Sequence, residues 1–231
     1  MRTQADSLGK VFSESSAVLF DFDGPICHVF LGLPAPQVAA GLKDLLATIA
    51  PSLAGALNTN DPMEVHRVSM EGGPAALEAV EAALTEAEVR AVQVAGEPVD
   101  GAVRALRAAK ASGRRVAIVS NNSSECVWEY LALHDLTGVV DEVFGRPKLR
   151  PDLMKPSPHP LLSAAAALAV DPTRMVLIGD SVTDVEAALA TDARSVGYAN
   201  KPTKERALAE AGADAVTLSM ESVADALTRL G

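Results

Sequence analysis

Residues 18–25 read Val-Leu-Phe-Asp-Phe-Asp-Gly-Pro, an apolar run that ends in two aspartates, one residue apart, and a glycine. The run from Val18 to Phe20 predicts a short buried strand, because brief apolar runs bounded by turn residues are typical of parallel sheets. Asp21 and Asp23 then lie at the carboxyl end of that strand, where open parallel sheets bind ligands. Taken alone, the stretch also fits an ordinary Asp-Gly turn.

The two aspartates indicate a particular chemistry. Carboxylates this close repel each other unless a cation or a shared proton separates their charges. Mg²⁺ prefers oxygen ligands and is held by a few carboxylates together with waters. The pair therefore favours a metal-assisted site in which one carboxylate also acts as a nucleophile.

A second apolar run, at residues 116–119, ends in Ser120, Asn121 and Asn122. The Ser120 hydroxyl can donate a hydrogen bond, and the N–H groups after it can face an anion. A plainer interpretation makes residues 120–123 a loop and N-cap for a helix that begins near Ser124. The two interpretations are compatible, since an exposed helix N-terminus itself binds phosphate.

A lysine lies in a proline-rich stretch, residues 150–158. Its three prolines predict a stiff, non-helical segment until Ser157 and Pro158 begin a helix as N-cap and first residue. Lys155, held in such a frame, can direct its ammonium at a phosphoryl oxygen. A lone loop lysine is more often simply solvated.

The last cluster follows an apolar run at residues 175–178, which predicts another strand. Asp180 falls at the end of this strand, beside Asp21 if the two strands are neighbours. Asp184 falls in the first turn of the following helix, where a favourable interaction with the helix dipole is the simpler explanation. Asp180 and Ser181 could likewise be only a cap pair.

These residues, in this order, resemble the four motifs of the haloacid dehalogenase-like (HAD) hydrolase superfamily, and the chain looks like its phosphoglycolate phosphatase-like members. The resemblance rests on residues 21–24, Ser120, Lys155-Pro156 and residues 179–184, and the segments that carry it cover roughly two-thirds of the chain. It implies an α/β fold, a Rossmann-like three-layer parallel sheet. Residues 1–27 and 96–231 would form this core, and residues 28–95 an inserted small α-helical cap.

The resemblance also implies the roles of the matched residues. Asp21 would attack the substrate phosphorus and form an aspartyl-phosphate. Asp23 would protonate the leaving oxygen and then activate the water that cleaves the intermediate. Ser120, Asn121 and Lys155 would bind the transferring phosphoryl group. Pro25 departs from the family pattern, since many family phosphatases carry threonine or valine there, but no catalytic group is lost.

The implied cofactor is Mg²⁺. The resemblance assigns it to the carboxylates of Asp21 and Asp180, the backbone carbonyl of Asp23, and waters. Asp184 would orient one of the waters or bind weakly. These assignments agree with the preference of Mg²⁺ for oxygen ligands.

Composition limits the partners. The 231 residues are 48% hydrophobic and carry a net charge of −10, which argues against a nucleic-acid backbone but not against a small phosphorylated metabolite. Cys27 and Cys126 show neither metal-ligand nor disulfide spacing, and the first residues contain no signal segment, so we expect a cytoplasmic protein. No apolar run is long enough to cross a membrane.

The cap region is acidic: residues 28–100 hold three Lys/Arg against ten Asp/Glu, so a cation there stands out. We expect Arg67 to contact the non-phosphate part of the substrate; the alternative is an exposed residue paired with Glu64 or Glu71. His28 is a second candidate for specificity, with a partly buried hinge residue as its alternative. Apolar spacing predicts helices at 37–50, 62–70 and 74–94, with the glutamates of the last (Glu78, Glu81, Glu86 and Glu88) largely facing water.

The remaining chain alternates strands and helices, which predicts a parallel sheet covered on both faces. The expected helices are 98–112, 157–169, 182–191 and one from Met220, and the expected strands are 139–144, 194–198 and 215–216.

The function that this pattern predicts is a Mg²⁺-dependent phosphatase acting on a small phosphomonoester metabolite. A phosphomutase that isomerises a sugar phosphate with the same Asp21 nucleophile is the alternative, and a non-catalytic phospholigand-binding protein is a weaker one. A haloacid dehalogenase is disfavoured, because its chemistry needs no Mg²⁺ and leaves Asp23 and Asp180 without a purpose. Specificity resides in the cap and its loops rather than in the fold.

Overall fold

The protein, described here by a computed structural model for residues 4–230 and for side chains from residue 7 onward, is built on a parallel sheet. Its strand order is β3-β2-β1-β4-β5-β6, and every neighbouring pair is parallel. The strands are β1 Ala17–Phe20, β2 Arg115–Val119, β3 Glu142–Phe144, β4 Met175–Gly179, β5 Arg194–Tyr198 and β6 Ala215–Thr217. The predicted α/β class is confirmed.

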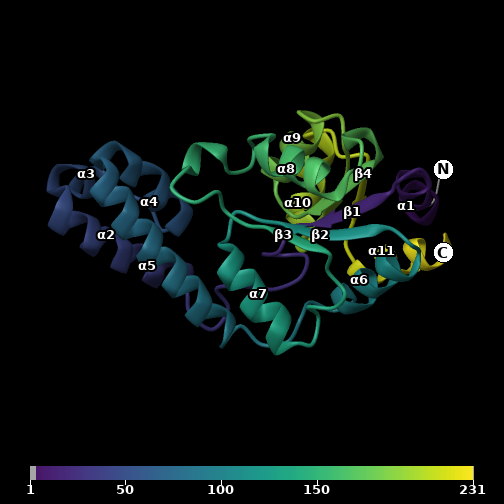
Figure 1. The fold of residues 1–231 in the computed structure, drawn as a ribbon, viewed down its shortest axis with the longest axis horizontal. Coiled ribbons are helices and arrows are strands. Elements are labelled where there is room, and N and C mark those ends of the chain that lie inside the picture. Colours follow the sequence, from purple (N-terminus) through teal and green to yellow (C-terminus); the bar gives the residue numbers. More distant parts are fainter. Residues whose placement is uncertain (1–3, 231) are drawn as a thin grey trace.

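Helices cover both faces of the sheet, giving three layers (Figure 1). They are α1 Gln4–Phe12, α6 Ala102–Ala111, α7 Ser124–Leu133, α8 His159–Leu168, α9 Val182–Leu189, α10 Pro202–Glu210 and α11 Met220–Thr228. Side chains alternate along β1: Val18 and Phe20 pack with α1, α6, α7 and α11, while Ala17 and Leu19 pack with α8 and α9. Because the central strands are buried on both faces, they read as continuous apolar runs.

A helical lobe, defined as α2 to α5, projects from one end of the sheet (Figure 1). Its helices are α2 Ala35–Ile49, α3 Pro51–Ala56, α4 Pro62–Ser69 and α5 Pro74–Val92. The lobe has a hydrophobic cluster of its own, which includes Leu42, Val65 and Leu84. Helix α5 joins two clusters, because its last turn, with Ala91 and Val92, packs in the core beside the sheet.

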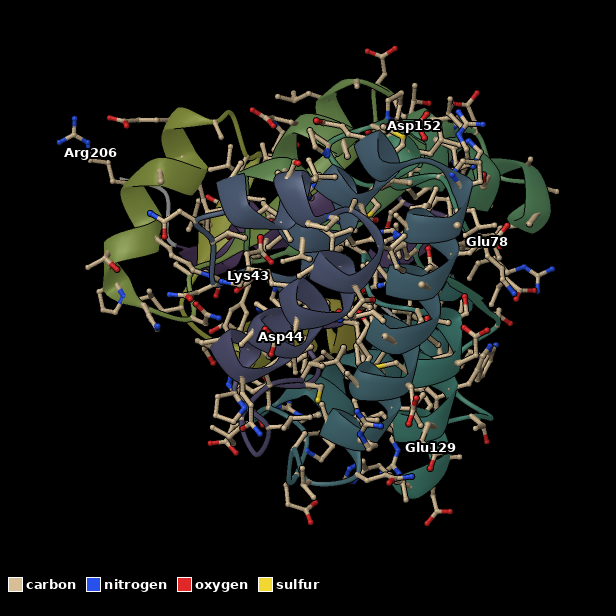
Figure 2. The ribbon with its side chains drawn as sticks, turned by 90° about the vertical axis from the view of Figure 1, so that its left-hand side faces the viewer. Lys43, Asp44, Glu78, Glu129, Asp152 and Arg206 are labelled. Carbon is tan, nitrogen blue, oxygen red and sulfur yellow. The ribbon has the colours of Figure 1, made fainter. Side chains whose placement is uncertain are left out.

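Figure 2 looks onto the lobe, with Lys43 and Asp44 on α2 in front and Arg206 of α10 and Glu78 of α5 on opposite sides. The ammonium of Lys43 donates to the Thr59 carbonyl oxygen at 2.8 Å. This bond ties α2 to the loop that precedes α4. No helix among residues 4–230 combines the length and apolar character needed to cross a bilayer.

Several elements differ from expectation. Helices α1, α3 and α10 were not predicted; α3 buries no residue and α10 buries only Leu208, so neither carries an apolar stripe that periodicity can detect. Helix α8 begins at His159 with Pro158 as its N-cap, one residue later than expected. Residues 151–153, expected to be non-helical, form a turn of 3₁₀ helix, a conformation compatible with a proline at its first position.

Candidate active site

The carboxyl ends of β1, β2 and β4 bring the predicted acidic residues together. Strands β1 and β4 are neighbours, with Phe20 beside Ile178, and the Asp21 N–H donates to the Ile178 carbonyl oxygen at 2.8 Å. Asp21 thus lies beside the end of β4, as expected. Carboxylate oxygens of Asp21, Asp180 and Asp184 all lie within 4.8 Å of one another.

Lys155 lies within this group of acids, and its side chain is only 2% exposed. Its ammonium nitrogen is 2.9 Å from Asp21 Oδ1 and 2.5 Å from Asp184 Oδ1, and it donates to the Val119 carbonyl oxygen at 2.9 Å. Burial lowers the pKa of Lys155, but the two carboxylates outweigh burial and raise it. The lysine is therefore held as a cation against Asp21.

Asp21 carries the most perturbed carboxyl group of the site. Burial, followed by the negative charge of Asp184, raises its pKa to about 8, although Lys155 acts in the opposite direction. A carboxylate in this position needs further positive charge to be ionised at neutral pH.

The site suits a hard divalent cation. Its donors are carboxylate oxygens, which Mg²⁺ prefers, and the two lysines that pair with them, Lys155 and Lys204, do not neutralise three acids. Two glycines allow the backbone to approach these acids: a Cβ on Gly24 would lie 2.4 Å from Asp180 Cγ, and one on Gly179 would lie 2.3 Å from Asp184 Cγ. The residues present therefore fit the predicted metal.

Asp184 combines the two interpretations that the sequence left open. Its Oδ2 accepts from the Ser181 N–H at 3.1 Å, completing a capping box at the start of α9. Its Oδ1 faces Lys155 instead. One carboxylate thus caps the helix and contributes charge to the site.

Asp180 has two partners that the sequence did not indicate. Asn200 donates its amide to Asp180 Oδ2 at 2.7 Å, and the ammonium of Lys204 pairs with the same oxygen. Asn200 follows β5 and Lys204 belongs to α10, the helix without an apolar stripe. No motif marks either residue, since only the fold brings them to Asp180.

Asp23 is not one of the three carboxylates that lie within 4.8 Å of one another. Its Oδ1 accepts from the Val29 N–H at 3.1 Å, and burial raises its pKa. Asp23 lines the same cleft as Asp21. A carboxyl group with a raised pKa is suited to donating a proton.

The loop after β2 is tightly bonded. Ser120 Oγ donates to Asn122 Oδ1 at 3.2 Å and accepts from the Asn122 N–H at 3.1 Å. Asn121 makes a reciprocal pair with the Lys155 backbone: its Oδ1 accepts from the Lys155 N–H at 2.9 Å and its Nδ2 donates to the Lys155 carbonyl oxygen at 3.2 Å. The Asn121 side chain thus positions the lysine segment, in addition to lining the cleft. The predicted N-cap is present, because Ser123 caps α7.

A cleft of about 780 Å³ connects this site with the lobe. Asp21, Asp23, Ser120, Asn121, Lys155 and Asp180 line its core side, and Phe30, the loop 59–61, the start of α4 and Arg67 line the lobe side.

The two specificity candidates have different positions. Arg67 is exposed, lines the cleft, and makes no ion pair with Glu64 or Glu71 among the described residues. His28 is also exposed, but among the described residues it is not one that lines this cleft.

A buried ionic network behind the Ser120 loop was missed. Glu81 and Glu88 of α5 were expected to face water, but they are 6% and 0% exposed. Both bond to the buried Arg146, Glu81 to its Nε and Glu88 to its Nη1, each at 2.8 Å. The signal was present: Leu77, Glu81, Leu84 and Glu88 recur at helical spacing, so the glutamates continue a buried stripe.

The pKa of Glu81 shows how strongly this network favours the ionised carboxylate. Burial alone would raise its pKa, but the bond with His66 and the charge of Arg146 outweigh burial and lower it to about 2. His66 Nε2 lies 2.8 Å from Glu81 Oε2, so the network also reaches α4.

Comparison with known proteins agrees with this architecture. Residues 16–192 match the haloacid dehalogenase-like hydrolase family. The plasmid phosphoglycolate phosphatase of Cupriavidus necator is 30% identical over 234 residues, covering 92% of this chain and 93% of that protein. The phosphoglycolate phosphatase of Thiobacillus denitrificans is 30% identical over 141 residues, 60% of each protein. The crystal structure of a HAD family hydrolase from Deinococcus radiodurans, with bound phosphate and sodium, has 26% identity and a TM-score of 0.60, covering 95% of this chain and 97% of that one.

Proposed function

The chain belongs to the haloacid dehalogenase-like hydrolases, and from this we propose that it is a Mg²⁺-dependent phosphatase acting on a small phosphomonoester through an aspartyl-phosphate on Asp21. One observation carries the proposal: the Asp21 carboxylate lies in the cleft, 2.9 Å from a buried ammonium and beside two further acids. This arrangement supplies a nucleophile together with a place for the cation that lets it approach an anionic ester.

In the first step, an oxygen of Asp21 attacks phosphorus and the ester P–O bond breaks. The leaving oxygen takes a proton from Asp23, whose raised pKa favours the protonated form. An alcohol is released and the phosphoryl group stays on Asp21. In the second step, Asp23 takes a proton from a water whose oxygen attacks phosphorus. The P–O bond to Asp21 then breaks, inorganic phosphate leaves, and both aspartates return to their starting states.

Asp21, Asp180 and Asp184 would hold Mg²⁺, with the Asp23 carbonyl as a further ligand. Bound there, the cation would neutralise charge on the acids and on the phosphoryl oxygens. Lys155 and the Ser120 loop would bind the remaining phosphoryl oxygens. Because Lys155 is held by Val119 and Asp184, its charge is already in position before substrate binds.

The substrate class we propose is a small phosphorylated carboxylic acid. Arg67 offers, on the lobe side of the cleft, a guanidinium that pairs with no acid in the described part of the chain, and guanidinium binds carboxylate with two parallel hydrogen bonds. The curated relatives named phosphoglycolate phosphatase support the same class, since their named substrate carries one carboxylate and one phosphate.

The first experiment measures phosphate release from a panel of small phosphomonoesters, with Mg²⁺ and with EDTA. The variants are wild type, Asp21→Asn and, as a matched control, Asp44→Asn, an exposed acid on α2 (Figure 2). We expect Mg²⁺-dependent release that is fastest for phosphorylated carboxylic acids, absent in Asp21→Asn and unchanged in Asp44→Asn. A sugar phosphate that is isomerised without phosphate release would instead identify a phosphomutase.

A further inference from the structure

We infer that Glu88 and Asn122 are positioning residues that brace the Ser120 loop against helix α5 of the lobe, with Arg146 as the centre of the brace. The contacts form an uninterrupted chain, from α5 through Arg146 and Glu88 to Asn122 and Ser120. The link to phosphoryl binding rests on the proposed function, whereas the brace itself does not.

Arg146 is held from two sides. Glu81 and Glu88 of α5 bind its guanidinium. Thr85, which lies between these two glutamates on the same helix, accepts from Arg146 Nη2 through its Oγ1 at 3.1 Å. On the core side, Nη1 donates to the Asn121 carbonyl oxygen at 3.1 Å. The side chain is fully buried. Arg146 therefore joins one face of α5 directly to the backbone of the loop.

Glu88 makes the second connection. Its Oε1 accepts from Asn122 Nδ2 at 3.1 Å and its Oε2 from the Ser123 N–H at 3.0 Å. Asn122 links Glu88 to Ser120, because its Oδ1 accepts a hydrogen bond from the Ser120 hydroxyl. The amide of Asn122 thus determines where the Ser120 hydroxyl points.

The brace ties lobe and core together where the phosphoryl group would bind. Leu149 N–H also donates to Glu81 at 3.2 Å, so the segment after β3 is bonded to the same helix. Any movement that separates α5 from the loop would leave buried charges without partners, which is strongly unfavourable. We therefore expect α5 and residues 120–123 to move as one unit.

A reciprocal exchange of side chains tests the brace. Asn122→Asp keeps the oxygen that accepts from Ser120 but places a carboxylate where the amide had faced Glu88. Glu88→Gln removes a charge and one acceptor from the same contact. The double variant Glu88→Gln/Asn122→Asp restores an amide–carboxylate pair and the charge of the network. Glu78→Gln, at an exposed glutamate of the same helix, is the matched control, because it makes the same chemical change as Glu88→Gln and leaves the brace contacts intact.

Two readouts are needed, hydrogen exchange of the amides of residues 120–126 without substrate, and affinity for inorganic phosphate with Mg²⁺. In each single variant we expect loop exchange to accelerate and phosphate affinity to fall about 10-fold, since groups in one network couple strongly. The double variant should recover part of both, because it restores the contact with residue 122 and the network charge but not the acceptor that Arg146 or Ser123 loses. Glu78→Gln should stay within about two-fold of wild type. Near-ultraviolet circular dichroism verifies that each variant is folded.

The outcomes separate the brace from the proposed function. Faster loop exchange in the folded single variants, with recovery in the double variant, supports the brace even if the wild type releases no phosphate. Wild-type exchange in folded Asn122→Asp overturns the brace while leaving a phosphatase activity untouched. An equal loss in Glu78→Gln also overturns it, because the effect would then belong to α5 as a whole.

Discussion

The two sides of the cleft are built differently. On the core side, Lys155, Asp21 and Asp184 are buried, and the Lys155 ammonium lies within 2.9 Å of both carboxyl groups. On the lobe side, Arg67 is exposed and has no ion pair among the described residues. A buried, paired group keeps one geometry before the substrate arrives, whereas an exposed, unpaired group is free to meet a ligand.

The contrast suggests a division of labour. Chemistry that needs fixed charges belongs to the buried side, and recognition of the variable part of a substrate belongs to the exposed side. Substitutions on the core side should therefore reduce turnover or folding stability, and substitutions on the lobe side should change the apparent affinity for substrate.

After the complete loss expected in Asp21→Asn, the largest effect is expected for Asp23→Asn, which removes the proton donor and later acceptor. We expect a loss of about 10³-fold in kcat/KM, within the usual range for general acid–base catalysis. Because burial raises the pKa of Asp23, the wild-type rate should fall as pH rises through that pKa, and this alkaline limb should be missing in the variant. An unchanged limb in the pH–rate profile of Asp23→Asn would assign the proton transfer to another group.

The next largest effect is expected for Lys155→Met, which tests the difference between the buried and the exposed side of the cleft through the free energy of unfolding. The change leaves Asp21 and Asp184 buried without their cation, and we expect a loss of about 3–5 kcal/mol in the free energy of unfolding in EDTA. Urea denaturation measures it, and Mg²⁺ should reduce the loss. Lys148→Met, at an exposed lysine, is the control and should change stability by less than about 0.5 kcal/mol. Equal effects at both lysines would remove the distinction between buried and exposed charge.

The sequence predicted where the core-side residues lie, because its signals are local. Asp21, Asp23, Ser120 and Asp180 each follow an apolar run that forms a strand, and parallel strands bring their carboxyl ends to one edge. Once the strands are assigned, the fold requires these residues to be near one another. Lys155 lacks a strand of its own and was identified only by its place in the motif order.

What the sequence missed depends on contacts between distant segments. Arg146 meets Glu81 and Glu88 from more than 50 residues away, and nothing near Arg146 marks it as buried. The two glutamates were assigned to the solvent because charge usually lies there, although their spacing placed them on the face of Leu77 and Leu84. Lys204 reaches Asp180 from a helix that buries one residue and so has no detectable apolar pattern.

Arg67→Leu tests the lobe side. We expect KM for a phosphorylated carboxylic acid to rise about 10- to 100-fold, as for a lost hydrogen bond to a charged group, with kcat within about two-fold of wild type. For a phosphomonoester without a carboxylate, KM should hardly change. Arg90→Leu, at an exposed arginine of α5, is the control. A fall in kcat equal to that in kcat/KM would instead place Arg67 with the groups that act on the transition state.

The smallest effect concerns the pH dependence of the metal-free protein. Burial, followed by the charge of Asp184, raises the pKa of Asp21 from 3.8 to about 8 in the folded state. The folded state therefore binds a proton more tightly than the unfolded chain, and stability present at acid pH is lost as pH rises towards 8. In EDTA, raising the pH from 6 to 7 should lower the free energy of unfolding of the wild type by about 1.4 kcal/mol relative to Asp21→Asn, which cannot titrate there.

Mg²⁺ should reduce this slope, since a cation beside Asp21 lowers its pKa. If the free energies of unfolding of wild type and Asp21→Asn in EDTA change with pH in parallel, the pKa of Asp21 is not raised in the folded state. The contrast between the core side and the lobe side would then rest on burial alone.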